Sequence, residues 1–209
     1  MPNRGDRGGS RTRAHIAEVA TGLFLDRGFD DVTIAEVAAA AGVSKVTVFS
    51  HFDRKEDLLL DRLPDVVEIA RAAVRERADD ISPVAALRQT LLTLAEERHG
   101  LSGLAEGTEP FLRIALQAPT VIARLRVFEH EIEAALSEEL VSDPRFSGDS
   151  ALLAALVVAA YRIVATATVR RRLAGDDLAA VTADHRLRLK RAFDAVEYGT
   201  SAPPRPPAG

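Results

Sequence analysis

The stretch AGVSKVTVFSHFDRKEDLL, residues 41–59, decides the fold of the first part of this chain. Gly42 follows a run of alanines, and Ser44 is a residue type that caps the start of helices. Glycine permits the sharp turn, often with a positive φ angle, that joins two helices at close range. Val48 and Phe52 lie four residues apart, so both would face inward on a helix that starts after Ser44. The stretch therefore predicts two helices joined by a tight turn, which is a helix-turn-helix.

Helical spacing continues in front of this stretch. Ile16, Ala20 and Phe24 recur at intervals of four residues, and the glycine at position 28 is placed to end that helix. Thr33 is followed three residues later by Glu36, which is the pattern of a capping box at the start of a second helix. The N-terminal part is thus predicted to hold three helices, of which the last two form the helix-turn-helix.

The third helix is the candidate reader of DNA. Its outward positions hold hydroxyl, amino and imidazole groups, which can reach base edges or phosphates in a major groove. These residues are Ser44, Lys45, Thr47, Ser50 and His51. Because the whole chain has a net charge of -4, any nucleic acid must be held by a local patch and not by bulk charge.

The rest of the chain also has helical patterns. No segment of useful length alternates apolar and polar residues with the period of a strand. We expect an all-α protein of about nine helices, with a helix-turn-helix domain followed by a second helical domain. The expected segments are a disordered basic arm over residues 1–10, the helix-turn-helix domain over 11–57, the second domain over 58–199 and a disordered proline-rich tail over 200–209.

Composition and spacing argue against several other classes of protein. The chain has no cysteine, which excludes disulfides and thiolate metal sites. The most apolar run, residues 151–161, is shorter than the about 20 residues that span a bilayer, so we expect a buried helix and a cytoplasmic protein without a membrane partner. Glu129, His130, Glu131 and Glu133 would point in different directions on a helix, so we expect no metal site. The chain has no phosphate-binding loop or GxGxxG motif, and we expect neither an enzyme nor a cofactor.

The segment over residues 13–59 resembles the DNA-binding domain of TetR-family transcriptional regulators. That family reads approximately as a helix ending in LF…GF, followed by TxxxIAxxAGVSxxTxYxHFxxKExLL. This chain has LFLDRGF over 23–29, TIAEVAAAAGVS over 33–44 and KVTVFSHFDRKEDLL over 45–59. The resemblance implies an N-terminal DNA-binding domain of three helices and a C-terminal helical domain that binds an effector and dimerises.

The resemblance also implies which residues contact DNA. Thr33 and Ser44 would place backbone N–H groups and hydroxyls at phosphates, and Lys55 would hold a phosphate at the start of the fourth helix. The positions at which the family reads bases are occupied here by Lys45, Val46, Thr47 and Ser50, with His51 nearby. The alternatives are that Thr33 only caps its helix and that Lys55 is a plain surface lysine.

Two positions depart from the family pattern. Phe49 replaces the usual tyrosine, which removes a hydroxyl that would bond a phosphate, and Val46 stands where the family often has a small residue. An exposed Val46 would contact a thymine methyl group, whereas in the alternative both side chains simply pack. Arg11 and Arg13 belong to a basic arm that either follows phosphates and enters a minor groove or only keeps the chain soluble.

The last two long helices are the expected dimer surface. In the family the final two helices usually form a four-helix bundle across a two-fold axis. The apolar face expected to do so here comprises Leu152, Leu153, Leu156, Val157, Ala160 and Val164. The alternative is that this face is only the core of one subunit.

The middle helices are expected to enclose a pocket for a largely apolar small-molecule effector. Candidate lining residues are Phe111, Ile114, Leu125 and Phe128, and candidate polar anchors are Arg113, Gln117, His130, Tyr161 and Arg162. Arg162 lies in an apolar run and needs a partner, which is either an internal carboxylate or an anionic ligand. The C-terminal two-thirds also resemble a TetR subgroup thought to sense acyl-CoA-like ligands, including regulators of mycofactocin genes.

Sequence and resemblance together predict a homodimeric, ligand-responsive repressor. It would bind a palindromic operator in double-stranded DNA, and effector binding would favour a dimer whose reading helices are wrongly spaced. The alternative is a helical ligand-binding protein whose DNA binding is weakened or lost, which the departures at Val46 and Phe49 keep open.

Overall fold

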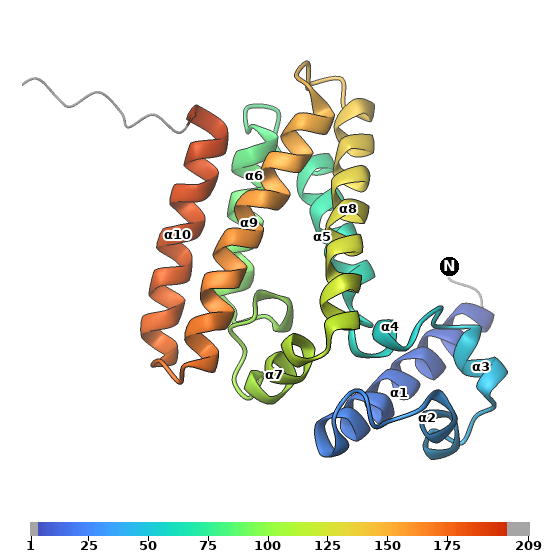
Figure 1. The fold of residues 1–209 in the computed structure, drawn as a ribbon. Helices are drawn as coiled ribbons and strands as arrows, with labels where there is room; N and C mark the ends of the chain where they lie inside the picture. The colour runs from blue at the N-terminus through green and yellow to red at the C-terminus, as the bar shows by residue number, and fades with distance from the viewer. Residues whose placement is uncertain (1–3, 200–209) are drawn as a thin grey trace, which may run out of the picture. The chain divides into compact units, whose positions relative to one another are not determined.

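The computed structural model describes residues 4–199, with side chains from residue 9 onward. Every regular element in this part of the chain is a helix, so the predicted all-α class is confirmed. The helices are α1 (Arg4–Arg27), α2 (Ile34–Ala40), α3 (Lys45–Phe49), α4 (Lys55–Leu59), α5 (Leu63–Arg75), α6 (Pro83–Glu96), the 3₁₀ turn η1 (Gly100–Ser102), α7 (Glu109–Gln117), α8 (Pro119–Ser142), α9 (Ser150–Leu173) and α10 (Leu178–Tyr198). Figure 1 shows their order along the ribbon. The proline-rich tail expected over residues 200–209 lies outside the described residues, as do residues 1–3.

The chain divides into two compact units, whose limits differ from the expected boundary at residue 58. The first unit contains Met1–Pro64 and Gly107–Phe128, and the second contains Asp65–Glu106 and Glu129–Gly209. The middle segment joins the first unit because Ala115, Ala118 and Val121 are buried in the same core as α1. The sequence could not show that this segment joins the first unit, because an apolar residue at helical spacing does not indicate which helix it packs against.

The core of the first unit forms around one face of α1. Ile16, Ala20 and Phe24, spaced by four residues, are each fully buried. The rings of Phe24 and Phe29 lie 4.9 Å apart between centroids and are tilted by 52°. The short helices α2, α3 and α4 each contribute apolar side chains to this core, which are Val37, Ala38, Val48, Leu58 and Leu59. This packing holds α3 in place although a helix of five residues would not persist alone.

The start of α1 lies further toward the N-terminus than we expected. Residues 4–10, predicted as part of a disordered arm, continue α1 as helical turns. A helix that is already nucleated by packing adds further turns at little cost, even through polar sequence.

The helical pattern that starts at Lys55 is divided between two helices, α4 and α5, with a break after Leu59. Pro64 is the second residue of α5, where its missing N–H would have no helical partner in any case.

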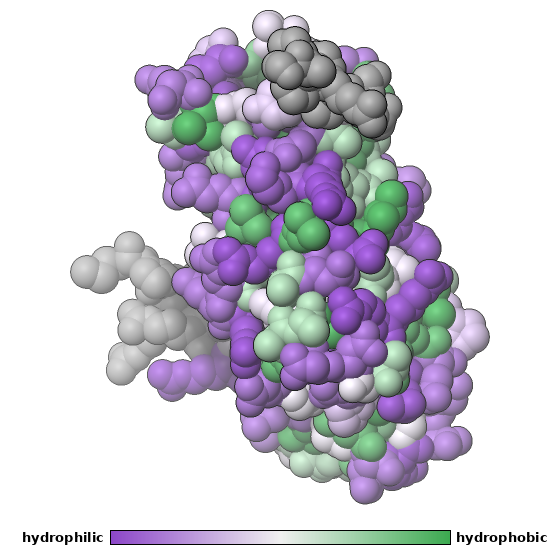
Figure 2. All heavy atoms as spheres, turned by 90° about the vertical axis from the view of Figure 1, so that its left-hand side faces the viewer, coloured by the Kyte–Doolittle hydropathy of each residue, from purple (hydrophilic) through white to green (hydrophobic). Residues whose placement is uncertain are grey.

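The second unit is built on the long helices α9 and α10. They run side by side after a short connection, and α6 packs against α10 (Figure 1). Their shared core contains Val157, Val164, Leu189 and Phe193 together with residues of α5, α6 and α8. On the face shown in Figure 2, hydrophilic residues dominate and apolar residues form small separate spots.

Helix α9 is long and apolar enough to cross a membrane by length and composition. Core helices of soluble proteins pass the same test, so this is weak evidence for a membrane span. Val157, Val164 and Thr168 of α9 are buried within the second unit, and Arg162 lies in the middle of the helix. These features are those of a helix that packs in a protein core.

Candidate nucleic-acid interface

The start of α2 is held by the predicted capping box. The Thr33 hydroxyl accepts a hydrogen bond from Glu36 N at 3.3 Å, and Glu36 Oε2 accepts one from Thr33 N at 2.8 Å. Arg27 also donates to Glu36 Oε1 at 2.8 Å. The bond from the Thr33 N–H, with the bonds from Arg27 and the Thr33 hydroxyl, lowers the pKa of Glu36 to about 2. Thr33 is exposed and acts as a cap, and its contact with DNA stays a prediction.

The turn between α2 and α3 depends on Gly42. Its φ of 66° lies in the left-handed region that favours glycine. Val43 N donates to Ala38 O at 2.9 Å, and Gly42 N donates to Ala39 O at 3.2 Å. This pair of bonds is the Schellman arrangement, which ends α2 and aims the chain into α3.

One side of helix α3 packs against the core, and the other side is exposed to solvent. Val48 and Phe52, predicted to face inward, are 0% and 3% exposed. Lys45, Val46, Phe49 and Ser50 are exposed, while Thr47 and His51 are half-buried. The structure thus brings most of the predicted reading residues onto the outer surface of one short helix and its C-terminal end.

The hydroxyl groups of this surface are engaged with one another. Ser44 Oγ accepts from Thr47 N at 3.0 Å and lies 2.8 Å from Thr47 Oγ1. Ser50 Oγ donates to Thr47 O at 2.7 Å. Ser44 therefore caps α3, as predicted. The hydroxyls of Ser44, Thr47 and Ser50 all take part in hydrogen bonds within this short segment.

Arg13 has a role that its sequence position did not suggest. Its guanidinium carbon lies 4.1 Å from the centroid of the Phe52 ring, and its nitrogens donate to His51 O and, at 3.4 Å, to Asp61 O. These contacts fix Arg13 against the C-terminal end of α3. Arg11, by contrast, is exposed and remains a candidate for phosphate contact.

Lys55 is likewise engaged within its own unit. Its Nζ lies 4.4 Å from the centroid of the Phe29 ring and donates to Asp30 O at 3.4 Å. A lysine above an aromatic face is held by the ring quadrupole. The structure therefore places Lys55 at the start of α4, as the resemblance implies, but half-buried and in contact with the core.

The predicted effector-binding residues fall into both units. Phe111, Ile114 and Leu125 pack against the core of the first unit, Phe128 is buried, and Arg113 and Gln117 are exposed. Two cavities, of about 360 and about 230 Å³, are lined by none of the nine candidates. The assignment of these residues to an effector pocket stays a prediction.

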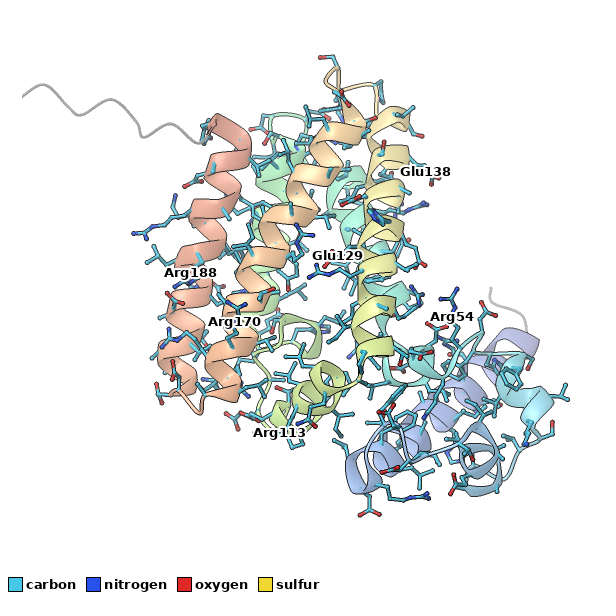
Figure 3. All side chains as sticks on the ribbon, viewed as in Figure 1. Arg54, Arg113, Glu129, Glu138, Arg170 and Arg188 are labelled. Atoms are coloured by element: carbon cyan, nitrogen blue, oxygen red, sulfur yellow. The ribbon has the colours of Figure 1, made fainter. Side chains whose placement is uncertain are left out.

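Arg162 has an internal partner, as one of the two alternatives proposed. Its Nη1 lies 3.2 Å from Glu129 Oε2 within the second unit, and Glu129 is on the side of α8 that faces α9 (Figure 3). The Arg162 side chain is 43% exposed and thus less buried than its apolar neighbours suggested. His130 is exposed and pairs with Glu133 at 3.0 Å. Tyr161 packs against the second core, and burial raises the pKa of its hydroxyl to about 12.

The residues of the apolar face predicted for dimerisation lie partly in the core and partly on the surface. Val157, Ala160 and Val164 are buried in the core of the second unit, and Leu153 is half-buried against it. The exposed apolar side chains of α9 are Leu152, Leu156 and Ile163, at 57%, 45% and 66%. The sequence prediction missed Ile163 because α9 is apolar on nearly all sides and gives no clear periodicity.

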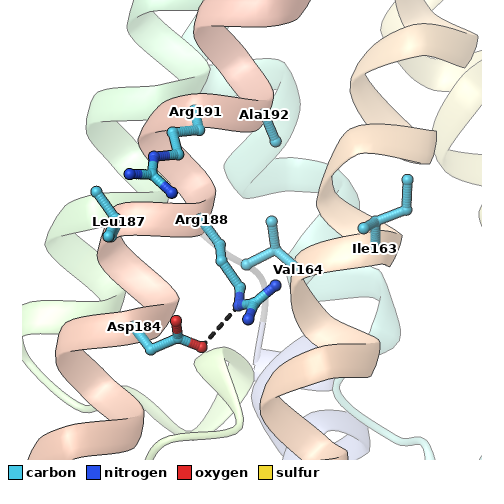
Figure 4. A pocket seen from close by; sticks show the side chains of 7 residues that line it. All are labelled: Ile163, Val164, Asp184, Leu187, Arg188, Arg191 and Ala192. Atoms are coloured by element: carbon cyan, nitrogen blue, oxygen red, sulfur yellow. Dashed lines mark hydrogen bonds and ion pairs between the residues drawn. The ribbon is translucent and has the colours of Figure 1, made fainter.

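A shallow groove lies beside these exposed residues. It holds about 360 Å³ and is lined by Ile163 and Val164 of α9 and by Asp184, Leu187, Arg188, Arg191 and Ala192 of α10 (Figure 4). Leu187 is 46% exposed, and Asp184 accepts from Arg188 Nε at 2.6 Å. The groove is lined by both apolar and charged side chains.

Comparison with known proteins finds relatives of the segment that contains the helix-turn-helix. Residues 16–61 match the family described as bacterial regulatory proteins, tetR family. The HTH-type transcriptional regulator TtgR of Pseudomonas putida is 37% identical over 90 residues, covering 41% of this chain and 42% of that protein. The HTH-type transcriptional repressor KstR2 of Rhodococcus jostii is 26% identical over 146 residues, covering 68% and 71%. The chain therefore aligns with less than half the length of TtgR.

The likeness extends over the whole described fold. Thermus thermophilus FadR, a TetR-family repressor crystallised with lauroyl-CoA, is 25% identical, with a TM-score of 0.56 over 94% of this chain and 99% of that one. The helix-turn-helix geometry, the matched segment and this shared all-helical architecture agree. Residues 16–61 therefore carry the DNA-binding domain of the tetR family, and the described residues share the all-helical fold of a TetR-family regulator.

Proposed function

We propose that this chain is a ligand-responsive repressor that binds a palindromic DNA operator as a homodimer and acts in the cytoplasm, where the DNA is. The observation that carries the proposal is the geometry of α3. Val48 and Phe52 anchor the helix, Gly42 aims it, and the opposite surface carries Lys45, Val46, Phe49 and Ser50 into solvent. An anchored helix with an exposed polar and apolar surface fits a major groove.

The contacts that we propose divide into two kinds. Lys45, Val46, Thr47 and Ser50, with His51 at the end of α3, would face base edges, and Arg11 would neutralise phosphates. The hydroxyls of Thr33 and Ser44 lie at helix starts, where phosphate contact is favoured by the exposed N–H groups. Arg13 and Lys55 would act chiefly by holding α3 and α4, because their cationic groups rest on Phe52 and Phe29.

Dimerisation is proposed through the outer side of α9 and the adjoining part of α10. At about 100° per residue, Leu152, Leu156 and Ile163 fall within roughly 40° of one another around α9, so they form one line. Leu187 of α10 lines the same groove as Ile163 of α9 (Figure 4). A line of exposed apolar residues bordered by charged ones has the composition of a protein–protein interface.

The effector is proposed to be a largely apolar small molecule of the acyl-CoA type. Support comes from FadR, which was crystallised with lauroyl-CoA and shares the fold across almost the whole chain. Effector binding would shift the population toward a dimer whose reading helices no longer match two half-sites one helical turn apart.

Selection from random duplexes tests the DNA-binding part of this proposal. The full chain is expected to enrich an inverted repeat, and binding should weaken steeply between about 50 and 200 mM salt because phosphate neutralisation releases counterions. A chain that enriches no sequence at any salt concentration would contradict the repressor. If such a chain still bound a ligand, the alternative of a ligand-binding protein without DNA binding would be supported.

Lauroyl-CoA is a suitable first probe for the effector. We expect it to raise the thermal unfolding midpoint of the chain and to weaken its affinity for the selected duplex, since both follow from preferential binding to one state. Free coenzyme A is the matched control for the acyl chain. An equal response to both compounds would argue against recognition of the apolar part.

A further inference from the structure

The surface of α3 carries two large apolar side chains in solvent. Val46 is 78% exposed and Phe49 is 54% exposed, whereas the neighbouring Val48 is fully buried. Residues three apart lie on the same side of a helix, so Val46 and Phe49 form one apolar spot. Nothing in the described part of the chain covers this spot.

The polar groups around the spot are already partly committed. A hydroxyl has a single proton to donate. The Ser50 proton is used on Thr47 O, and the contact between Ser44 Oγ and Thr47 Oγ1 uses one proton of that pair. Three hydroxyls therefore keep one free proton among them, so hydrogen-bond donation to bases rests mainly on Lys45 and His51. Apolar contact is the larger part of what this surface offers.

The major groove displays one apolar group, the C5 methyl of thymine. We propose that Val46 is a specificity-determining residue that packs against a thymine methyl in each operator half-site, with Phe49 covering the side of that contact. This inference rests on the proposed function, in which α3 enters the major groove. It requires a thymine methyl group at one position of each half-site.

The size of the effect follows from the area involved. Removing one methyl group from a buried apolar contact changes affinity by about three- to fivefold. Because a symmetric dimer makes the contact twice, loss of the methyl in both half-sites should weaken binding by about tenfold or somewhat more.

Uracil replaces thymine without altering base pairing, so it isolates the methyl group. Each thymine of the selected duplex would be changed to deoxyuridine in both half-sites, and the dissociation constant would be measured for wild type, Val46→Ala and Ser50→Ala. We expect one symmetric position at which wild type and Ser50→Ala lose about tenfold. At that position Val46→Ala should lose less than about twofold, while it keeps the effects of uracil at other positions.

Folding of the variant can be checked separately. Val46 is mostly exposed and alanine is a better helix former, so the unfolding midpoint of Val46→Ala should equal that of wild type or exceed it slightly. If uracil has the same effect on wild type and Val46→Ala at every position, the inference is wrong while the repressor stands. If wild type selects no duplex at all, the proposed function fails and the inference fails with it.

Discussion

Phe49 shows how one missing atom can set the strength of DNA binding. The family pattern has tyrosine here, and the exposed Phe49 ring has no hydroxyl to bond a phosphate. We expect Phe49→Tyr to tighten binding to specific and non-specific duplexes alike, by about fivefold per chain and about 25-fold for the dimer, since a net hydrogen bond is worth about 1 kcal/mol. Titration of both duplexes with the two proteins measures this. A gain confined to one sequence would show that the position reads bases.

Arg11 and Arg13 are two residues apart, yet the structure gives them different roles. Arg13→Ala should lower the free energy of unfolding by about 1–2 kcal/mol, because it removes a cation–π contact with Phe52 and bonds to two carbonyls. Arg11→Ala should leave stability unchanged and reduce the salt dependence of DNA binding by about one counterion per chain. Urea unfolding and salt titrations separate the two. Equal loss of stability in both variants would contradict the assignment.

Local patterns were sufficient for the caps but not for the cationic side chains. Thr33, Ser44 and Gly42 could be assigned from sequence because a cap or a turn depends on neighbours within a few residues. Arg13 meets His51, which is 38 positions away, and Lys55 meets Asp30, which is 25 positions away. Such contacts exist only after the helices have packed, so the sequence indicated a DNA contact where the structure shows an internal one.

At the scale of elements, His185 links α9 and α10. It is 1% exposed, and its Nδ1 lies 2.7 Å from Thr168 Oγ1. Burial lowers the pKa of His185 below its ordinary value of about 6.5, and nearby Asp184 only partly opposes this. Below that pH the unfolded chain binds a proton that the folded chain resists, so stability should fall as the pH drops from 7.5 to 5.5.

Unfolding experiments at several pH values test this link. The loss should be no more than about 1.4 kcal/mol per pH unit, and His185→Asn should remove it because asparagine does not titrate. His130→Gln is the control, since His130 is exposed on the surface of α8. An identical pH response in wild type and His185→Asn would exclude His185 as the cause.

For helix α9, the sequence predicts where the helix lies in the chain but not which of its sides is buried. Its extent from Ser150 to Leu173 follows from the cap at Asp149 and the apolar run, which are both local patterns. Which side faces the core could not be predicted, because apolar residues surround the helix. Packing against α10 and α6 decides that Val157 and Val164 lie inside and Leu156 and Ile163 outside. That α7 packs into the core of the first unit could not be predicted for the same reason.

For the whole molecule, the proposed binding to a palindromic operator requires two chains. The double variant Leu156→Asp with Ile163→Asp places four charges in the proposed dimer contact, and we expect a folded monomer by analytical ultracentrifugation. Its affinity for the palindrome should fall at least about 100-fold, because a single half-site contact lacks the gain from linkage. Val141→Asp is the control, since Val141 is 75% exposed on α8. A dimeric double variant would move the interface elsewhere.

The proposed function requires that α3 makes this chain a sequence-specific DNA-binding protein. The most direct measurement is the ratio of dissociation constants for the selected palindrome and for a scrambled duplex of equal length, with the full chain at about 150 mM salt. We expect a ratio of at least about 1,000, as specific DNA-binding proteins show. A ratio near one, with both affinities falling equally as salt rises, would contradict it.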